Sequence, residues 1–272
     1  MAAFSIEQSF LGTQRIVARE WPLLLPVMLA FMVLPSFATD LLVPEALRTG
    51  LTAAMEAGNP APIMQAARWL FPLSIVLFLC GSLGGLALTA LAVVPRISVK
   101  EAILLAFRRL PVMIGVLVLL FAGLMAAAFV VTLVLFMLRL DMRVVQSLLF
   151  GALSGMVIVA AARLSVLNGI ILTRRVGPMA AISESWHLTR KLFWRLFAGF
   201  AVYVVGGMIV VLALGSAIGA VVLLAGNGLG APDLAFAVNA FVSRLLAALV
   251  GAGLHLLGAV YFLQLGGSSR GI

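Results

Sequence analysis

Six long apolar stretches, separated by shorter segments that carry most of the charged residues, dominate the pattern of this chain of 272 residues. As an α-helix, each stretch is long enough to cross a hydrocarbon core about 30 Å thick at a rise of about 1.5 Å per residue. The sequence therefore predicts an all-α integral membrane protein with six transmembrane helices. We place these helices at residues 22–42, 69–94, 112–138, 145–173, 196–225 and 234–265.

A second pattern recurs in three of the connecting segments, where small residues appear at every fourth position. The three sets are Ser5, Ser9 and Thr13; Ser98, Ala102 and Ala106; and Gly177, Ala181 and Ser185. Apolar residues in the same segments follow a 3.6-residue period while charges occupy other faces, which is typical of a helix lying in the membrane interface. Polar loops between the spans are the alternative.

Each of these segments is followed by a basic group and then by two apolar runs, so the repeating unit is a short elbow helix plus a helical hairpin. Within a single membrane domain, 1–272, the repeats would cover residues 1–95, 96–175 and 176–272. Units that begin on the same side of the membrane are related by an axis along the membrane normal. Chance spacing of small residues in an Ala- and Gly-rich chain is the alternative.

Lysine and arginine are unevenly divided between the two sides of this topology. If the N-terminus is cytoplasmic, twelve of the 18 basic residues lie on the cytoplasmic side: Arg15, Arg19, Arg96, Lys100, Arg108, Arg109, Arg174, Arg175, Arg190, Lys191, Arg195 and Arg270. Four lie on the opposite side: Arg48, Arg68, Arg139 and Arg143. Because positive residues resist translocation, both termini are expected in the cytoplasm.

Composition excludes a water-soluble fold. Hydrophobic residues make up 64% of the chain and charged residues only 10%, against about 25% charged in soluble domains. The net charge of +9 comes from basic clusters beside apolar runs, so we expect anionic lipid headgroups as partners and no nucleic acid. Candidate interfacial lipid contacts are Arg108, Arg109, Trp186, Arg190, Lys191 and Arg195.

The sequence gives little reason to expect catalysis or a cofactor. Cys80 is the only cysteine, and neither His187 nor His255 has a carboxylate or cysteine partner at metal-ligand spacing. Several glycines fit close helix packing instead: Gly151 with Gly155, and Gly215 with Gly219, have the small-xxx-small spacing of packed membrane helices. We therefore expect neither an enzyme nor a metal site.

Arg163 lies inside the fourth apolar stretch, about eleven residues or ~16 Å of helix from the basic end at Arg174. A central arginine costs about 2.5–3.5 kcal/mol in a bilayer, so it is expected to face the protein or a wet cavity. It is the candidate intramembrane contact for an anion or lipid, although protein carbonyls and polar side chains could satisfy it purely structurally. Arg244, expected to snorkel towards the headgroups, and His255, expected to hydrogen-bond between helices, are weaker candidates.

One stretch carries a family resemblance. It runs from Ala162-Arg163-Leu164-Ser165 through Gly177-Pro178 and Ser185-Trp186-His187-Leu188-Thr189 to Trp194-Arg195, and it resembles the glycerophosphoryl diester phosphodiesterase membrane-domain family and the related YciC-like bacterial inner-membrane proteins. The opening segment 4–21 and the chain end at Tyr261 look similar too. Lys191 departs from the family pattern, which commonly has glycine there. The resemblance implies an inner-membrane protein, in some members fused to a soluble phosphodiesterase domain that is not seen here.

These observations lead to a functional expectation. The first hypothesis is a non-catalytic, multi-pass protein of the bacterial inner membrane that acts in envelope or lipid homeostasis as an accessory or scaffold. The alternative is a transporter or permease for an anionic or lipidic substrate that uses Arg163. A closed, dry helix bundle would favour the first, and a polar cavity around Arg163 would favour the second.

Overall fold

The computed structural model describes residues 5–43, 60–138, 142–174 and 176–266, which form helices and no strands. In chain order these are α1 (Ile6–Met28), the π-helical turn η1 (Leu29–Val33), α2 (Leu34–Leu42), α4 (Pro60–Val93), α5 (Val99–Met137), α6 (Met142–Arg163), α7 (Leu167–Thr173), α8 (Pro178–Thr189), α9 (Phe193–Gly228) and α10 (Pro232–Gln264). Five helical segments are long and apolar enough to cross a membrane, and the bent pair α6 and α7 makes a sixth if it crosses as one span. The prediction of an all-α, multi-pass membrane protein is confirmed.

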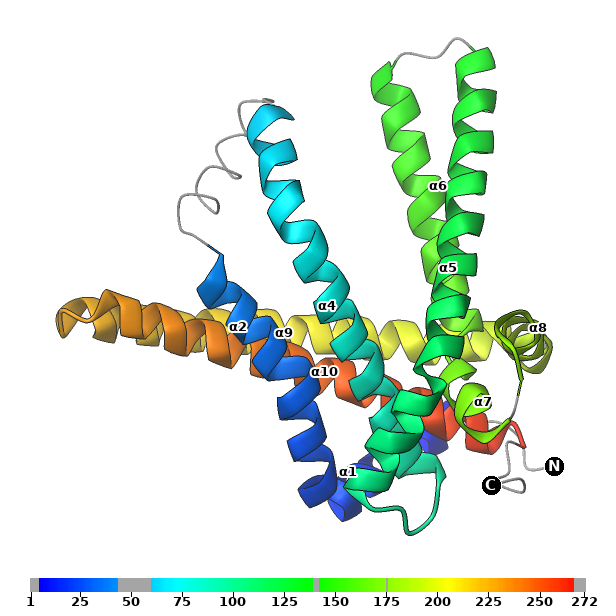
Figure 1. Cartoon of the computed structure of the whole chain (residues 1–272), viewed down its shortest axis with the longest axis horizontal. Coiled ribbons are helices and arrows are strands. Elements are labelled where there is room, and N and C mark those ends of the chain that lie inside the picture. Colours follow the sequence, from blue (N-terminus) through cyan, green and yellow to red (C-terminus); the bar gives the residue numbers. More distant parts are fainter. Residues whose placement is uncertain (1–4, 44–59, 139–141, 175, 267–272) are drawn as a thin grey trace.

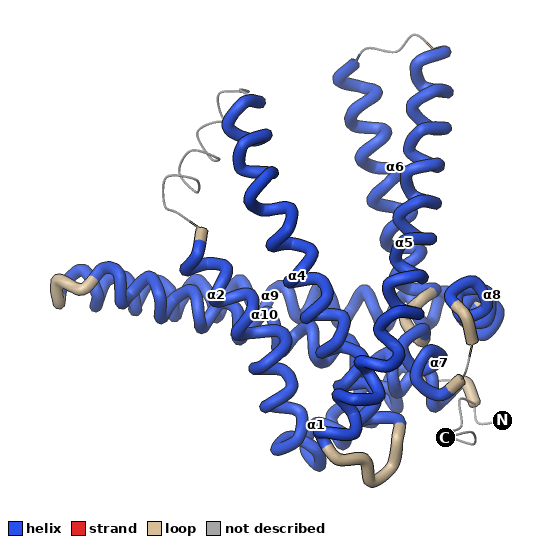
Figure 2. The backbone as a smooth tube through the Cα atoms, viewed as in Figure 1, coloured by secondary structure: helices blue, strands red, loops and turns tan. Residues whose placement is uncertain are grey.

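Three hairpins extend from a common base. Figure 1 shows α2 with α4 and α5 with α6 rising from that base, while α9 and α10 run across the molecule together. The base is formed by α1, α7 and the adjoining ends of α4 and α10, and the described connections are short (Figure 2). The two ends of the described chain meet there, because Ser9 Oγ donates a hydrogen bond to Gln264 Oε1 at 3.1 Å.

Burial is concentrated in the base. Leu86 of α4, Ile170 of α7, and Leu256, Tyr261 and Phe262 of α10 have almost no exposed surface. By contrast, the distal parts of α5 and α9 expose large apolar side chains: Phe121, Phe129, Phe136, Leu212, Val221 and Leu224. Exposing this much apolar surface to water would cost about 25 cal/mol per Å². Lipid chains are the solvent that suits these helices.

Of the four glycines indicated by small-xxx-small spacing, Gly219 packs closely, since a Cβ there would lie 2.8 Å from Asn239 Oδ1 of α10. A Cβ atom added to Gly151, Gly155 or Gly215 would meet no other atom within 4 Å, so the packing prediction is wrong at these positions. In the base, a Cβ on Gly258 of α10 would lie 2.3 Å from the carbonyl oxygen of Ser165.

The three elbow segments begin at the residues that the small-residue pattern indicates. Their N-caps are Ser5, Ser98 and Gly177. The residues four and eight positions further along are buried in each case: Ser9 and Thr13, Ala102 and Ala106, and Ala181 and Ser185. The small residues therefore form the face of each elbow that packs against the base.

Only the third elbow is a separate helix. The first continues through Pro22 and Pro26 to the end of α1, and the second continues through Pro111 into the span of α5. The prediction of three separate short helices is wrong for these two elbows. Each proline removes one backbone hydrogen bond of the helix, and the helix continues through it. The chain after α8 does break, since Leu192 leaves helical backbone geometry at φ −118 and ψ 13.

Candidate interfacial site around Arg163

The fourth predicted span is broken beside Arg163. Instead of one helix over 145–173, α6 ends at Arg163 and α7 begins at Leu167, with a bend of 44° between them. The turn fits closely under α10, because Gly258 has no side chain to collide with Ser165. The distance of about 16 Å from Arg163 to Arg174 assumed a straight helix, which the bend shortens.

The end of α6 is held by α8. The last carbonyl groups of a helix have no N–H partner within it. Ser185, on the buried face of α8, donates a hydrogen bond from Oγ to the carbonyl oxygen of Arg163 at 2.8 Å. Arg174 forms an ion pair with Glu184 of α8. The elbow α8 is therefore docked on both sides of the bend, through the α6 terminus and through the residue that follows α7.

Two aromatic rings enclose the guanidinium of Arg163. Its Cζ lies 4.9 Å from the ring centroid of Trp186 in α8 and 4.5 Å from that of Phe193 at the start of α9. Arg163 thus faces protein, between the elbow helix α8 and the start of α9. Its exposed fraction as a whole residue is intermediate, so the guanidinium lies near the edge of the protein.

The hydrogen-bonding capacity of this guanidinium is incompletely used. Nε and NH1 of Arg163 are buried and have no acceptor among the residues that the structure describes. A buried donor without a partner costs about 1–3 kcal/mol, and more if charged. A desolvated cation–π contact stabilises the bound cation by about 2 kcal/mol. The rings therefore hold the charge without satisfying its in-plane donors.

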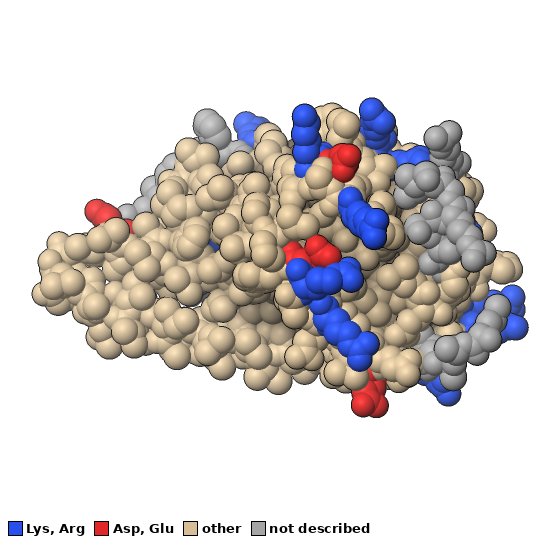
Figure 3. Space-filling view, turned by 90° about the horizontal axis from the view of Figure 1, so that it is seen from below, with Lys and Arg blue, Asp and Glu red and all other residues tan. Residues whose placement is uncertain are grey.

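The basic interfacial candidates lie around this site and along the base. Arg108, Trp186, Arg190, Lys191 and Arg195 are exposed, and Arg109 is half-buried. Figure 3, seen from below relative to Figure 1, shows Lys and Arg side chains gathered over the base and sparse over the projecting hairpin. Arg48, Arg139, Arg175 and Arg270, which also entered the charge count, lie outside the described residues.

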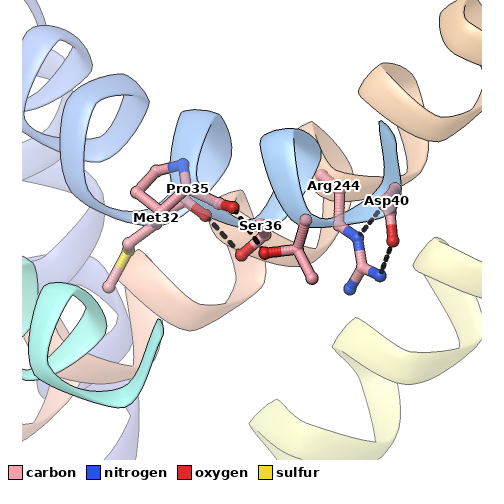
Figure 4. Close-up of polar contacts among 6 residues, drawn as sticks. Met32, Pro35, Ser36, Asp40 and Arg244 are labelled. Atoms are coloured by element: carbon pink, nitrogen blue, oxygen red, sulfur yellow. Dashed lines mark hydrogen bonds and ion pairs between the residues drawn. The ribbon is translucent and has the colours of Figure 1, made fainter. Parts of the chain in front are cut away.

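Arg244 forms an ion pair that the sequence did not predict. Its Nε and NH2 donate hydrogen bonds to Asp40 Oδ2 and Oδ1, both at 2.6 Å, and form a bidentate ion pair between α10 and α2 (Figure 4). The residues are 204 positions apart, so the pattern along the chain gave no sign of the pair. Asp40 was a signal nonetheless, because a lone carboxylate near the end of an apolar span needs a partner.

His255 makes the expected hydrogen bond between helices. Its Nδ1 lies 3.2 Å from Asn168 Nδ2, which joins α10 to α7. The imidazole fits against α4 because Gly85 has no side chain there: a Cβ would come within 2.5 Å of the ring. Asn168 was not singled out from the sequence, although it lies in a stretch of otherwise apolar or small residues.

The structure brings together two predicted site residues, Arg163 and Trp186. It also shows two contacts of Arg163 that the sequence did not predict. Phe193 lies against its guanidinium, and Ser185 donates a hydrogen bond to its carbonyl oxygen. Comparison with known proteins finds no matching family model, no matching curated protein and no matching solved structure. The family resemblance stays a prediction. What this membrane protein does must be inferred from its own residues.

Proposed function

We propose that this chain is a non-catalytic, multi-pass protein of the bacterial inner membrane that acts in envelope or lipid homeostasis as an accessory or scaffold. Its base faces the cytoplasm and engages anionic lipids. One observation carries the proposal: most of the described Lys and Arg residues gather over the base, beside the elbow helices and away from the projecting hairpin (Figure 3). Anionic headgroups attract such a surface by about 1 kcal/mol for each basic residue near the membrane.

The elbow helices support an interfacial role because each has two unlike faces. One face carries the buried small residues and packs against the base. The other exposes apolar side chains next to basic ones: Leu11 in α1, Leu104 and Phe107 in α5, and Met179 and Trp186 in α8. A helix of this kind places its apolar side chains among the acyl chains and its basic side chains at the headgroups.

We also propose that the three elbow and hairpin units are repeats related by an axis along the membrane normal. Their matching N-caps and matching buried positions support this relationship. The contact of α1 with α10 then joins the first unit to the last, and the contact of α4 with α5 joins the first to the second.

The packing of Arg163 favours a scaffold over a permease. In a transport pathway the guanidinium would line a wet cavity, whereas Nε and NH1 are buried beside Trp186 and Phe193. A transporter would need these rings to leave the site in each cycle.

Spin-labelled lipids test the proposal directly. The purified protein in phosphatidylcholine vesicles should retain spin-labelled phosphatidylglycerol at its surface more strongly than spin-labelled phosphatidylcholine. Changing Arg190, Lys191 and Arg195 together to Gln should remove most of this preference. Arg68→Gln, at an exposed position in α4 on the opposite side, is the matched control and should retain it. An equal association of both lipids with the parent protein would refute the proposed lipid engagement.

The proposed role in the cell has its own test. Deleting the gene from the bacterium that carries it should change the phospholipid composition or the sensitivity of the envelope to detergent. The parent gene should restore both, and the triple Gln variant should not. If deletion left both properties at the parent level, the role in envelope or lipid homeostasis would be wrong.

A further inference from the structure

We propose that Arg163 is the centre of a site for a phosphate oxyanion, supplied by the headgroup of a phospholipid at the cytoplasmic interface. This inference rests on the proposed function and deepens it, because it assigns one buried residue and one chemical group to the engagement of anionic lipid. The site lies between α8 and the start of α9, where α6 ends.

The donors of Arg163 identify the missing ligand as an anion with several oxygens. A guanidinium carries five N–H donors in one plane and no acceptor. The rings of Trp186 and Phe193 contact it at 4.9 and 4.5 Å, but an aromatic face is a poor acceptor for in-plane N–H groups. Among the described residues, Nε and NH1 have no acceptor. Each of them shares an edge of the guanidinium with NH2, and two oxygens of one phosphate can bridge either edge.

Four of the six carboxylates that the structure describes are engaged elsewhere, and the other two, Glu7 and Asp233, are exposed. Glu184 pairs with Arg174, Asp40 with Arg244 and Glu20 with Arg19. Glu101 accepts hydrogen bonds from the N-cap Ser98. Arg163 has no ion pair with any of these described carboxylates.

A ligand can reach the guanidinium from the partly exposed side of Arg163. Trp186 is 46% exposed, so its ring can turn aside without disturbing the buried face of α8 that Ser185 fastens to the Arg163 carbonyl. Arg190 follows Trp186 by four residues, which places the two on the same side of the helical chain. A second positive charge therefore flanks the approach.

The surroundings favour a lipid headgroup over free phosphate. Trp194 and Met179 expose apolar side chains on the neighbouring α9 and α8. Tryptophan is enriched at the membrane interface, at the depth of the headgroups. An acyl chain could lie on these side chains while its phosphate reaches Arg163, whereas inorganic phosphate gains nothing from them.

Native mass spectrometry in mild detergent provides the test, with dioleoyl phosphatidylglycerol as the probe. At collision energies that strip other lipids, the parent protein should retain one molecule of this lipid. Arg163→Gln should bind it about tenfold more weakly, as expected for the loss of a charge-assisted hydrogen bond. Arg68→Gln, at an exposed position in α4 that belongs to neither the interfacial lipid contacts nor the Arg163 site, is the matched control and should retain it like the parent. Arg163→Lys keeps the charge without the forked donors and should show an intermediate loss.

Inorganic phosphate separates the two sources of the oxyanion. Millimolar phosphate should displace little of the lipid from the parent and should not raise its thermal unfolding midpoint. A saturable stabilisation by phosphate that Arg163→Gln abolishes, without lipid retention, would overturn the lipid assignment. If Arg163→Gln proves unfolded by circular dichroism, the comparison of Arg163→Lys with the parent decides.

The outcomes also separate this inference from the proposed function. If the parent retains no phosphatidylglycerol, or if Arg163→Gln and Arg163→Lys both retain it like the parent, Arg163 is not the centre of a lipid site. The preference for spin-labelled phosphatidylglycerol, which depends on the exposed residues Arg190, Lys191 and Arg195, would persist in that case. Loss of that preference in the parent would instead refute the proposed function.

Discussion

Adding one methyl group at Gly258 should destabilise the base of this protein. In Gly258→Ala, the new Cβ would lie 2.3 Å from the carbonyl oxygen of Ser165, where ordinary van der Waals contact begins at 3.4 Å. The α10 helix and the turn between α6 and α7 would have to separate by about 1 Å. Both are backbone segments in a packed region, so rotation of a side chain cannot relieve the overlap. We expect a loss of about 1–3 kcal/mol, the usual cost of overpacking.

A matched control separates this overlap from the effect of alanine on the helix itself. Replacing glycine by alanine within a helix stabilises it by about 0.5–1 kcal/mol. Gly251 lies in the same helix α10, and a Cβ there would meet nothing within 4 Å. Gly251→Ala should therefore be neutral or slightly stabilising, and the difference between the two variants isolates the overlap.

The assay is reversible unfolding in dodecyl maltoside titrated with sodium dodecyl sulphate, followed by tryptophan fluorescence. Gly258→Ala should unfold at a lower fraction of sodium dodecyl sulphate than Gly251→Ala, with a difference in unfolding free energy of about 1–3 kcal/mol. Equal stability of the two variants would show that α10 does not lie against the turn at Ser165. The position of Arg163 beside α8, which depends on that turn, would then be wrong as well.

Three further predictions concern topology, the elbow α8 and the ion pair at the opposite end. Reporter fusions after Thr13, Ile103 and Ala181 should report cytoplasm and a fusion near Gly228 the far side; a far-side signal at Ala181 would break the six-span topology. Spin labels stepped through residues 179–190 should show accessibility with helical period, lowest at Ala181, Ser185 and Thr189, and a uniformly aqueous profile would rule out a docked α8. A double-mutant cycle of Asp40→Ala and Arg244→Ala should give a coupling of the order of 1 kcal/mol, because both side chains are partly exposed; additive losses would mean that the pair is not formed in detergent.

Part of the site could be predicted from the sequence. The four-residue spacing of small residues indicated which face of each elbow would be buried, and Ser9, Ala102 and Ser185 lie on those faces. Arg163 was identifiable because a charge inside an apolar stretch must find a partner. Neither observation gave the partners, since the pattern along a helix specifies a face and not the residue that packs against it.

The sequence by itself determined that this protein is a multi-pass helical membrane protein, because apolar length and the exclusion of charge from lipid are properties of the chain alone. Only the tertiary structure decided that the fourth stretch bends beside Arg163, that Trp186 and Phe193 enclose its guanidinium, and that Asp40 pairs with Arg244. Each of these features depends on contacts between residues distant in the sequence. The bend in particular requires the absence of a side chain at Gly258, which no local pattern around Ser165 reveals.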